Sequence, residues 1–108
     1  RALALAGTQV FIAPSARINC PMKEDHWLTN PKTRAIEYGC YVIAPAQFVN
    51  TYCVRTLVAD PYGIVLLEMQ KQHAISFVNI DLTKVKEIRK ILPLLKNRRV
   101  DTYSTVKV

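Results

Sequence analysis

The sequence has 108 residues, of which 50% are hydrophobic and 21% are charged. This length fits one small domain, and the composition excludes a disordered tail, a collagen-like repeat and a low-complexity linker. No apolar run approaches the roughly 20 residues that cross a bilayer, and no signal peptide is recognised, so we expect no membrane contact. The three cysteines include no CxxC pair, which favours reduced thiols and a cytoplasmic location over a disulfide framework.

Positive charge is concentrated in the last third of the chain. Residues 71–108 carry nine Lys and Arg against three Asp and Glu, which accounts for most of the formal net charge of +7. A solvated cationic helix and tail is the usual interpretation of such a segment. A nucleic-acid groove would also interleave aromatic side chains, and only Tyr103 is near these cations. We therefore expect no nucleic-acid binding and keep a non-catalytic basic interaction domain as an alternative function.

The first half of the sequence predicts two strands separated by a loop and a helix. In chain order we expect the end of a helix, a strand, a long loop, a short helix and a second strand, over residues 1–6, 9–13, 15–30, 31–38 and 40–44. Gly7 and Gly39 favour the ends of the two helices. Pro31 is tolerated only in the first turn of a helix, so the short helix is expected to begin there. The strands are apolar throughout, which is typical of a sheet covered on both faces.

The second half predicts a hairpin, a last strand and a basic helix. We expect these elements, in chain order, over residues 56–59 with 64–68, 74–80, and 83–92. The hairpin turn is Asp-Pro-Tyr-Gly at residues 60–63, where the proline presets φ and the glycine accepts a positive φ. Asp81 or Thr83 is expected to cap the helix, and Pro93 to stop it. The whole order of elements predicts a layered α/β protein with mixed strand directions.

Seven short motifs follow one another in the order and near the spacing of one enzyme superfamily. They include Arg-Ala-Leu-Ala-Leu-Ala-Gly, Pro-Ser-Ala, His-Trp and Asp-Pro-Tyr-Gly, and they lie at residues 1–7, 14–16, 26–27, 34–37, 40–47, 60–63 and 80–103. On these motifs the chain resembles the second half of the carbon–nitrogen hydrolase, or nitrilase-like, superfamily. The tail and closing helix look most similar to the amidases of small dicarboxylic acid amides.

The resemblance implies the C-terminal half of a four-layer α-β-β-α sandwich, so that residues 1–108 form a partial domain of an enzyme that is usually a homodimer. It implies hydrolysis of a small amide without a cofactor. A Glu-Lys-Cys triad carries this reaction, and its cysteine forms a thioester with the acyl group. The family's triad lies upstream of the position that matches Arg1, and Cys20, Cys40 and Cys53 match no nucleophile. We therefore expect no catalytic residue here and no activity of this chain alone. The alternative is that the chain is one half of a split amidase, which a separate N-terminal chain completes.

Five residues are candidates for the wall of a substrate pocket. Ser15 and Ala16 follow a strand whose end faces the family's active site, and Gln47 ends the next strand. His26 and Trp27 are expected on a loop beside the family's pocket. The alternative for this pair is that both residues pack a helix against the sheet. No spacing of His, Cys and acidic residues matches a zinc pattern, so we expect no metal.

Two residues depart from the family's pattern. Val54 stands where the family usually has a glycine, and a positive φ there would cost a valine roughly 1–2 kcal/mol. Pro31 falls inside a stretch that is usually helical, where a proline beyond the first turn costs about 3 kcal/mol. These departures suggest relaxed constraint, as in a truncated or decaying gene product.

Overall fold

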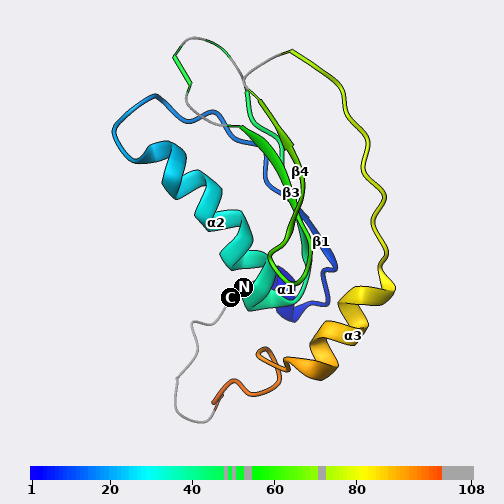
Figure 1. Ribbon diagram of the computed structural model, residues 1–108. Coiled ribbons are helices and arrows are strands. Elements are labelled where there is room, and N and C mark those ends of the chain that lie inside the picture. The colour runs from blue at the N-terminus through cyan, green and yellow to red at the C-terminus, as the bar shows by residue number, and fades with distance from the viewer. Residues whose placement is uncertain (48, 50, 53–54, 71–72, 101–108) are drawn as a thin grey trace.

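A four-stranded mixed sheet lies at the centre of the molecule (Figure 1). The structure is a computed structural model that describes residues 1–47, 49, 51–52, 55–70 and 73–100. In chain order the elements are α1 (Ala2–Leu5), β1 (Val10–Ile12), α2 (Lys23–Tyr38), β2 (Tyr41–Ala44), β3 (Thr56–Ala59), β4 (Val65–Met69) and α3 (Thr83–Ile91). The strands lie in sequence order, with β1 parallel to β2 and the other neighbours antiparallel. The predicted α/β class is confirmed, and so are the first two strands.

The predicted hairpin is confirmed as β3 and β4, and its turn is held by an aspartate. One carboxylate oxygen of Asp60 accepts hydrogen bonds from the backbone N–H groups of Tyr62 and Ile64, at 2.9 and 3.0 Å. Gly63 has a φ of 79°, which a glycine adopts without strain. Because Asp60 is buried and its acceptor oxygen is used, the turn carries no unsatisfied polar group at this position.

The long loop predicted before Pro31 is wrong in its second half, because α2 begins at Lys23 and contains Pro31 in its interior. The buried residues of α2 are Trp27, Pro31, Ala35 and Tyr38, which form one stripe along the helix. Spacings of three and four residues place side chains on one face. Pro31 thus lies on the face that packs on the sheet, where burial of its ring offsets the roughly 3 kcal/mol cost of an interior proline.

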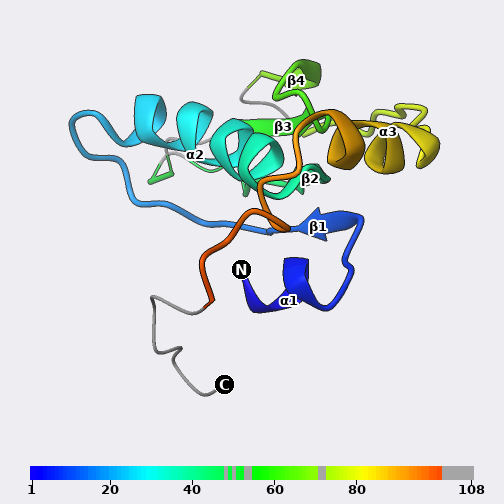
Figure 2. The ribbon, with the colours of Figure 1, turned by 90° about the horizontal axis from the view of Figure 1, so that it is seen from below.

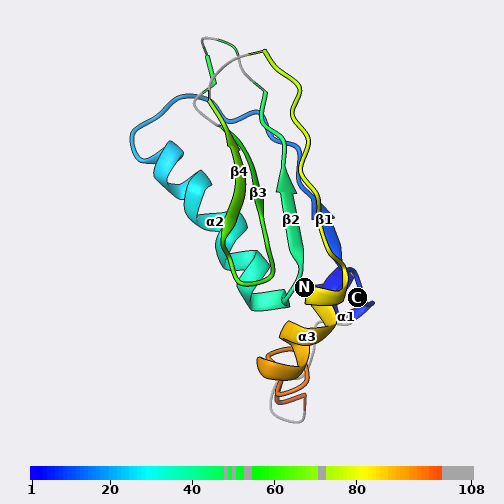
Figure 3. The same cartoon turned by 45° about the vertical axis from the view of Figure 1, so that its right-hand side comes forward.

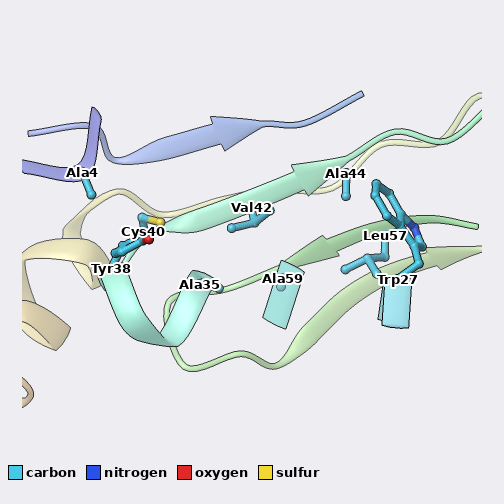
Figure 4. Packing of buried hydrophobic residues seen from close by; sticks show 9 residues of the cluster. All are labelled: Ala4, Trp27, Ala35, Tyr38, Cys40, Val42, Ala44, Leu57 and Ala59. Carbon is cyan, nitrogen blue, oxygen red and sulfur yellow. The ribbon is translucent and has the colours of Figure 1, made fainter. Parts of the chain in front are cut away.

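The hydrophobic core fills the space between α2 and one face of the sheet (Figure 4). The helix contributes Trp27, Ala35 and Tyr38. The strands contribute small and branched side chains that alternate with residues of the other face, namely Val42 and Ala44 from β2 and Leu57 and Ala59 from β3. Trp27 packs beside Leu57 and Ala44 in this view. The small alanine side chains on the strands leave room for the aromatic rings of the helix, so that α2 packs closely on the sheet.

Residues 73–82 form a long segment without regular structure, which runs along the side of the sheet opposite α2 (Figures 1 and 3). The predicted strand over residues 74–80 is therefore wrong for this structure. Its composition favours a strand, but a strand also needs a neighbour, and it pairs with none in the described part of the chain. Its end is fixed at Asp81, whose backbone carbonyl accepts a hydrogen bond from the Tyr41 hydroxyl at 3.0 Å.

The short helices α1 and α3 flank the end of the sheet where β1 and β2 begin (Figure 2). The helix end predicted before Gly7 is confirmed as α1, and Gly7 has a φ of 97°. The predicted basic helix is confirmed as α3. Asp81 accepts hydrogen bonds from the backbone N–H and the hydroxyl of Thr83, at 2.9 and 2.7 Å, and these bonds lower the pKa of its carboxyl group.

Arg89 attaches α3 to the rest of the molecule. Its guanidinium donates hydrogen bonds to the backbone carbonyls of Tyr38 and Thr8, at 3.2 and 2.6 Å. Val85 and Ile88 on the same helix are buried. One cation of the basic segment is thus used within the fold rather than presented to a ligand. Within the described residues, no helix combines the length and the apolar character that a membrane span requires.

Candidate functional site

A cavity of about 440 Å³ opens beyond the carboxyl ends of β1 and β2. Its lining consists of two short runs, residues 14–16 and residues 45–47. The structure thus brings together three of the five candidate pocket residues: Ser15, Ala16 and Gln47. In α/β sheets, ligands bind beyond the carboxyl ends of parallel strands, and β1 and β2 are the parallel pair here.

The two runs are held together by their main chains. The Ser15 N–H donates to the Pro45 carbonyl at 2.9 Å, and the Gln47 N–H donates to the Ser15 carbonyl at 2.9 Å. The Ala46 N–H donates to the hydroxyl of Thr56 on β3, at 3.0 Å. These bonds extend the pairing of the sheet past the ends of the strands, so the backbone of the wall is fixed while the Gln47 side chain is exposed.

A second cavity, of about 820 Å³, shares residues 45–47 with the first. Its other walls come from Thr56, from Met69 at the end of β4, and from residues 73–76. Gln47 therefore stands between two adjoining hollows. Both hollows are open to solvent, and their volumes fall within the roughly 300–1,000 Å³ range of small-molecule sites.

The structure places His26 and Trp27 on α2, and neither lines either cavity. Trp27 is 5% exposed, and its indole N–H donates to the carbonyl of Arg55 at 2.7 Å. The Arg17 guanidinium lies 5.4 Å from the centre of the same ring, in a cation–π contact. His26 is exposed. Trp27 thus takes the packing role that was the alternative, and His26 lies apart from the Ser15 and Gln47 group.

Arg55 is a residue that sequence reasoning missed. Its guanidinium forms ion pairs with Glu24 in the first turn of α2 and with Glu68 on β4, and the pair with Glu24 includes a hydrogen bond of 2.6 Å. The hydrogen bond that Arg55 donates to Glu24 is the main cause of the raised pKa of Arg55. The partners lie 31 and 13 residues away in sequence, so no local spacing signals them. This cluster holds Arg55, the residue that precedes β3, against α2 and β4.

The model of the carbon-nitrogen hydrolase family matches residues 1–90. The chain belongs to the carbon–nitrogen hydrolase family. It is 31% identical over 98 residues to a deaminated glutathione amidase of Escherichia coli O157:H7, and 34% identical over 112 residues to the human deaminated glutathione amidase. These alignments include 91% and 97% of this chain, but only 37% and 33% of the two relatives. The chain thus spans about a third of the length of these two relatives.

A solved structure also matches nearly all of this chain with only part of its own length. The NitFhit protein of Caenorhabditis elegans superposes with a TM-score of 0.82 and 33% identity, over 94% of this chain and 26% of that chain. The sheet and α2 are accordingly one β layer and one α layer of the family's α-β-β-α sandwich. The recognition of the family and of a partial sandwich from sequence is confirmed.

Of the two described cysteines of this carbon–nitrogen hydrolase chain, Cys40 is poorly suited to act as a nucleophile. Cys40 is buried, and burial raises the pKa of its thiol to about 11, so that it is protonated at neutral pH. Cys20 is exposed. Cys53 and Val54 lie outside the described residues. Within those residues, no group of three His, Cys, Asp or Glu side chains is placed to hold a metal ion.

Proposed function

We propose that this chain forms one wall of the active-site cleft of an amidase that hydrolyses a small amide. The observation that carries this proposal is the pair of adjoining cavities at the carboxyl ends of β1 and β2, with Gln47 between them. The names of the E. coli and human relatives support deaminated glutathione as the first amide to test.

Ser15 and Gln47 have the side chains in this wall that suit an amide substrate. The Gln47 amide both donates and accepts hydrogen bonds, and the Ser15 hydroxyl does the same. We assign them to substrate binding, because neither is a nucleophile with a neighbouring base in this structure. The covalent chemistry belongs to the Cys, Lys and Glu of the family's triad, which we place in the part of the enzyme that this chain does not match.

It follows that the 108-residue chain alone hydrolyses no amide. In another triad enzyme, loss of the nucleophile lowers kcat by a factor on the order of 10⁶. Supplying the missing part restores the reaction, either as a longer single chain or as a second chain of a split amidase. The complete enzyme is proposed to be a homodimer.

The test is complementation. The chain is co-expressed with the part of the E. coli amidase that lies outside the matched region, and the primary amine that amide hydrolysis sets free from deaminated glutathione is measured. We expect release only when both parts are present, sensitive to a thiol-alkylating reagent. Gln47→Ala should raise KM about tenfold, since one hydrogen bond is worth roughly 1 kcal/mol or somewhat more. Asn97→Ala, which changes an exposed amide outside the cavities, is the matched control.

Two results would contradict the proposal. Amide hydrolysis by the chain alone would show that it holds a nucleophile of its own. A folded complex or a folded single-chain fusion that hydrolyses no small amide would show that this wall does not belong to an amidase.

A further inference from the structure

Thr56, the first residue of β3, joins the sheet to the wall of the cleft. Its hydroxyl accepts the Ala46 N–H at 3.0 Å, and the residue also lines the cavity of about 820 Å³. Ala46 and Thr56 are both half-buried. A main-chain N–H that is shielded from water needs an acceptor, because leaving it unpaired costs free energy. The Thr56 side chain thus satisfies a main-chain group of the wall.

This hydroxyl takes the place of a main-chain acceptor. The antiparallel register pairs Ala44 of β2 with Leu57 of β3, so a ladder continued by two residues would set Ala46 opposite Arg55. The Arg55 carbonyl, however, accepts the indole N–H of Trp27 at 2.7 Å. With that carbonyl bonded to α2, the Ala46 N–H bonds to the neighbouring side chain instead.

The replacement occurs at the point where the chain enters the wall. Ala46 is followed by Gln47, whose N–H donates to the Ser15 carbonyl on the other side at 2.9 Å. The run 45–47 is therefore fixed from two sides, by the main chain of residues 14–16 and by the side chain of Thr56. Every residue supplies a main-chain carbonyl, so only the second contact depends on which amino acid is present.

We propose that Thr56 is a positioning residue of the cleft, whose hydroxyl fixes Ala46 and thereby sets where the Gln47 side chain enters the cavities. This inference rests on the proposed function, since it names a residue that governs substrate binding through Gln47. Thr56 lines only the larger cavity, whereas Gln47 stands between both. A displacement of about 1 Å is enough to weaken the contacts that a positioned side chain makes with substrate.

Three substitutions separate the hydroxyl from the shape of the side chain. Thr56→Val keeps the β-branched shape and removes the acceptor, whereas Thr56→Ser keeps the acceptor and removes a methyl group. Thr33→Val is the matched control. The Thr33 hydroxyl also bonds to main chain, the Thr29 carbonyl at 3.0 Å, but Thr33 is exposed on α2 and lines neither cavity.

Hydrogen exchange of single amides, followed by NMR on the 108-residue chain, tests the contact itself. The Ala46 rate is divided by that of the Tyr41 amide, which bonds to the Gln9 carbonyl at the start of β2 and reports changes of overall stability. Thr56→Val should raise this ratio about five- to tenfold, the effect of one hydrogen bond on a local opening equilibrium. Thr56→Ser and Thr33→Val should leave the ratio within about twofold.

Steady-state kinetics of the complete enzyme, as the complex or the single-chain fusion, test the effect on substrate. Thr56→Val should raise KM for deaminated glutathione about tenfold and change kcat by less than about threefold, because Gln47 is assigned to binding. Thr56→Ser should keep KM within about twofold of the original. In a Gln47→Ala background, Thr56→Val should add less than about twofold, since the side chain that it positions is gone. Independent effects would instead multiply to about 100-fold.

Three results would overturn the inference. They are an unchanged ratio of Ala46 to Tyr41 exchange in Thr56→Val, a Thr56→Ser variant that behaves like Thr56→Val, and effects of Thr56→Val and Gln47→Ala on KM that multiply in full. The fusion carries the same variants, so both measurements remain decisive where the 108-residue variant does not fold. A complete enzyme that hydrolyses no amide refutes only the proposed function, because the exchange rates still decide whether Thr56 holds Ala46. Amide hydrolysis with an unchanged KM in Thr56→Val refutes only the positioning role.

Discussion

Replacing Gly63 with alanine should destabilise the hairpin turn for two separate reasons. The φ of 79° costs a residue with a Cβ atom about 1–2 kcal/mol. A Cβ atom built at this position would also lie 2.7 Å from both Cγ1 and Cδ1 of Ile36 on α2. Overpacking of this kind costs typically about 1–3 kcal/mol. Because Ile36 is 41% exposed and has room to move, we expect about 2–4 kcal/mol in total.

A double-mutant cycle separates the two contributions. Urea unfolding is followed by the fluorescence of Trp27, which is the only tryptophan and is buried in the folded chain. Ile36→Ala removes both atoms that the new Cβ would meet, so the free energy of unfolding of Gly63→Ala should recover by about 1 kcal/mol or more in the double variant. Gly63→Asn should cost less than Gly63→Ala at the backbone, because asparagine tolerates a positive φ. A coupling below about 0.5 kcal/mol would refute the contact argument.

Three further predictions concern the described polar and thiol groups. Arg89→Leu removes two bonds to backbone carbonyls and should lower the free energy of unfolding by about 2–3 kcal/mol in urea; a loss below about 0.5 kcal/mol would contradict this role. Iodoacetamide at neutral pH should label Cys20 and spare Cys40 until the chain unfolds, and equal labelling by mass spectrometry would show that Cys40 is accessible. The hydrogen bond from Arg1 lowers the pKa of Glu37. The stabilisation from this pair is therefore present above the ordinary carboxyl pKa and is lost as acid protonates Glu37. Glu37→Gln should remove that acid dependence from urea unfolding curves, and an unchanged dependence would assign it to other carboxyl groups.

The elements that sequence predicts correctly here are those fixed by local chemistry. Gly39 has a φ of 53° and ends α2, as a helix-terminating glycine does. The Asp-Pro-Tyr-Gly turn sets the hairpin in the same way. The start of α2 is determined by a tertiary contact and not by local chemistry, because Trp27 and Pro31 are buried against the sheet. Local rules assign Pro31 to a first turn, and only the tertiary contact reverses that preference.

The candidate site also contains residues whose positions follow from local sequence and residues whose positions depend on tertiary contacts. Ser15 and Gln47 were predictable because each follows a strand, and strands β1 and β2 are neighbours whose ends meet. The His-Trp motif predicts that Trp27 lies beside the pocket. Trp27 is instead buried in the core, because α2 begins at Lys23, before the predicted start. The local sequence does not indicate the ion pairs of Arg55, since its two carboxylate partners lie on α2 and β4.

The wall at Ser15 and Gln47 and the segment of residues 74–80 differ in how the described residues hold them. The wall is held by main-chain hydrogen bonds between the two runs that form it, residues 14–16 and 45–47. Residues 74–80 make no such bonds among the described residues, and Phe77 is 92% exposed. Because the backbone of the wall is fixed and the Gln47 side chain is exposed, a substitution of that side chain should alter substrate binding while it leaves the free energy of unfolding nearly unchanged.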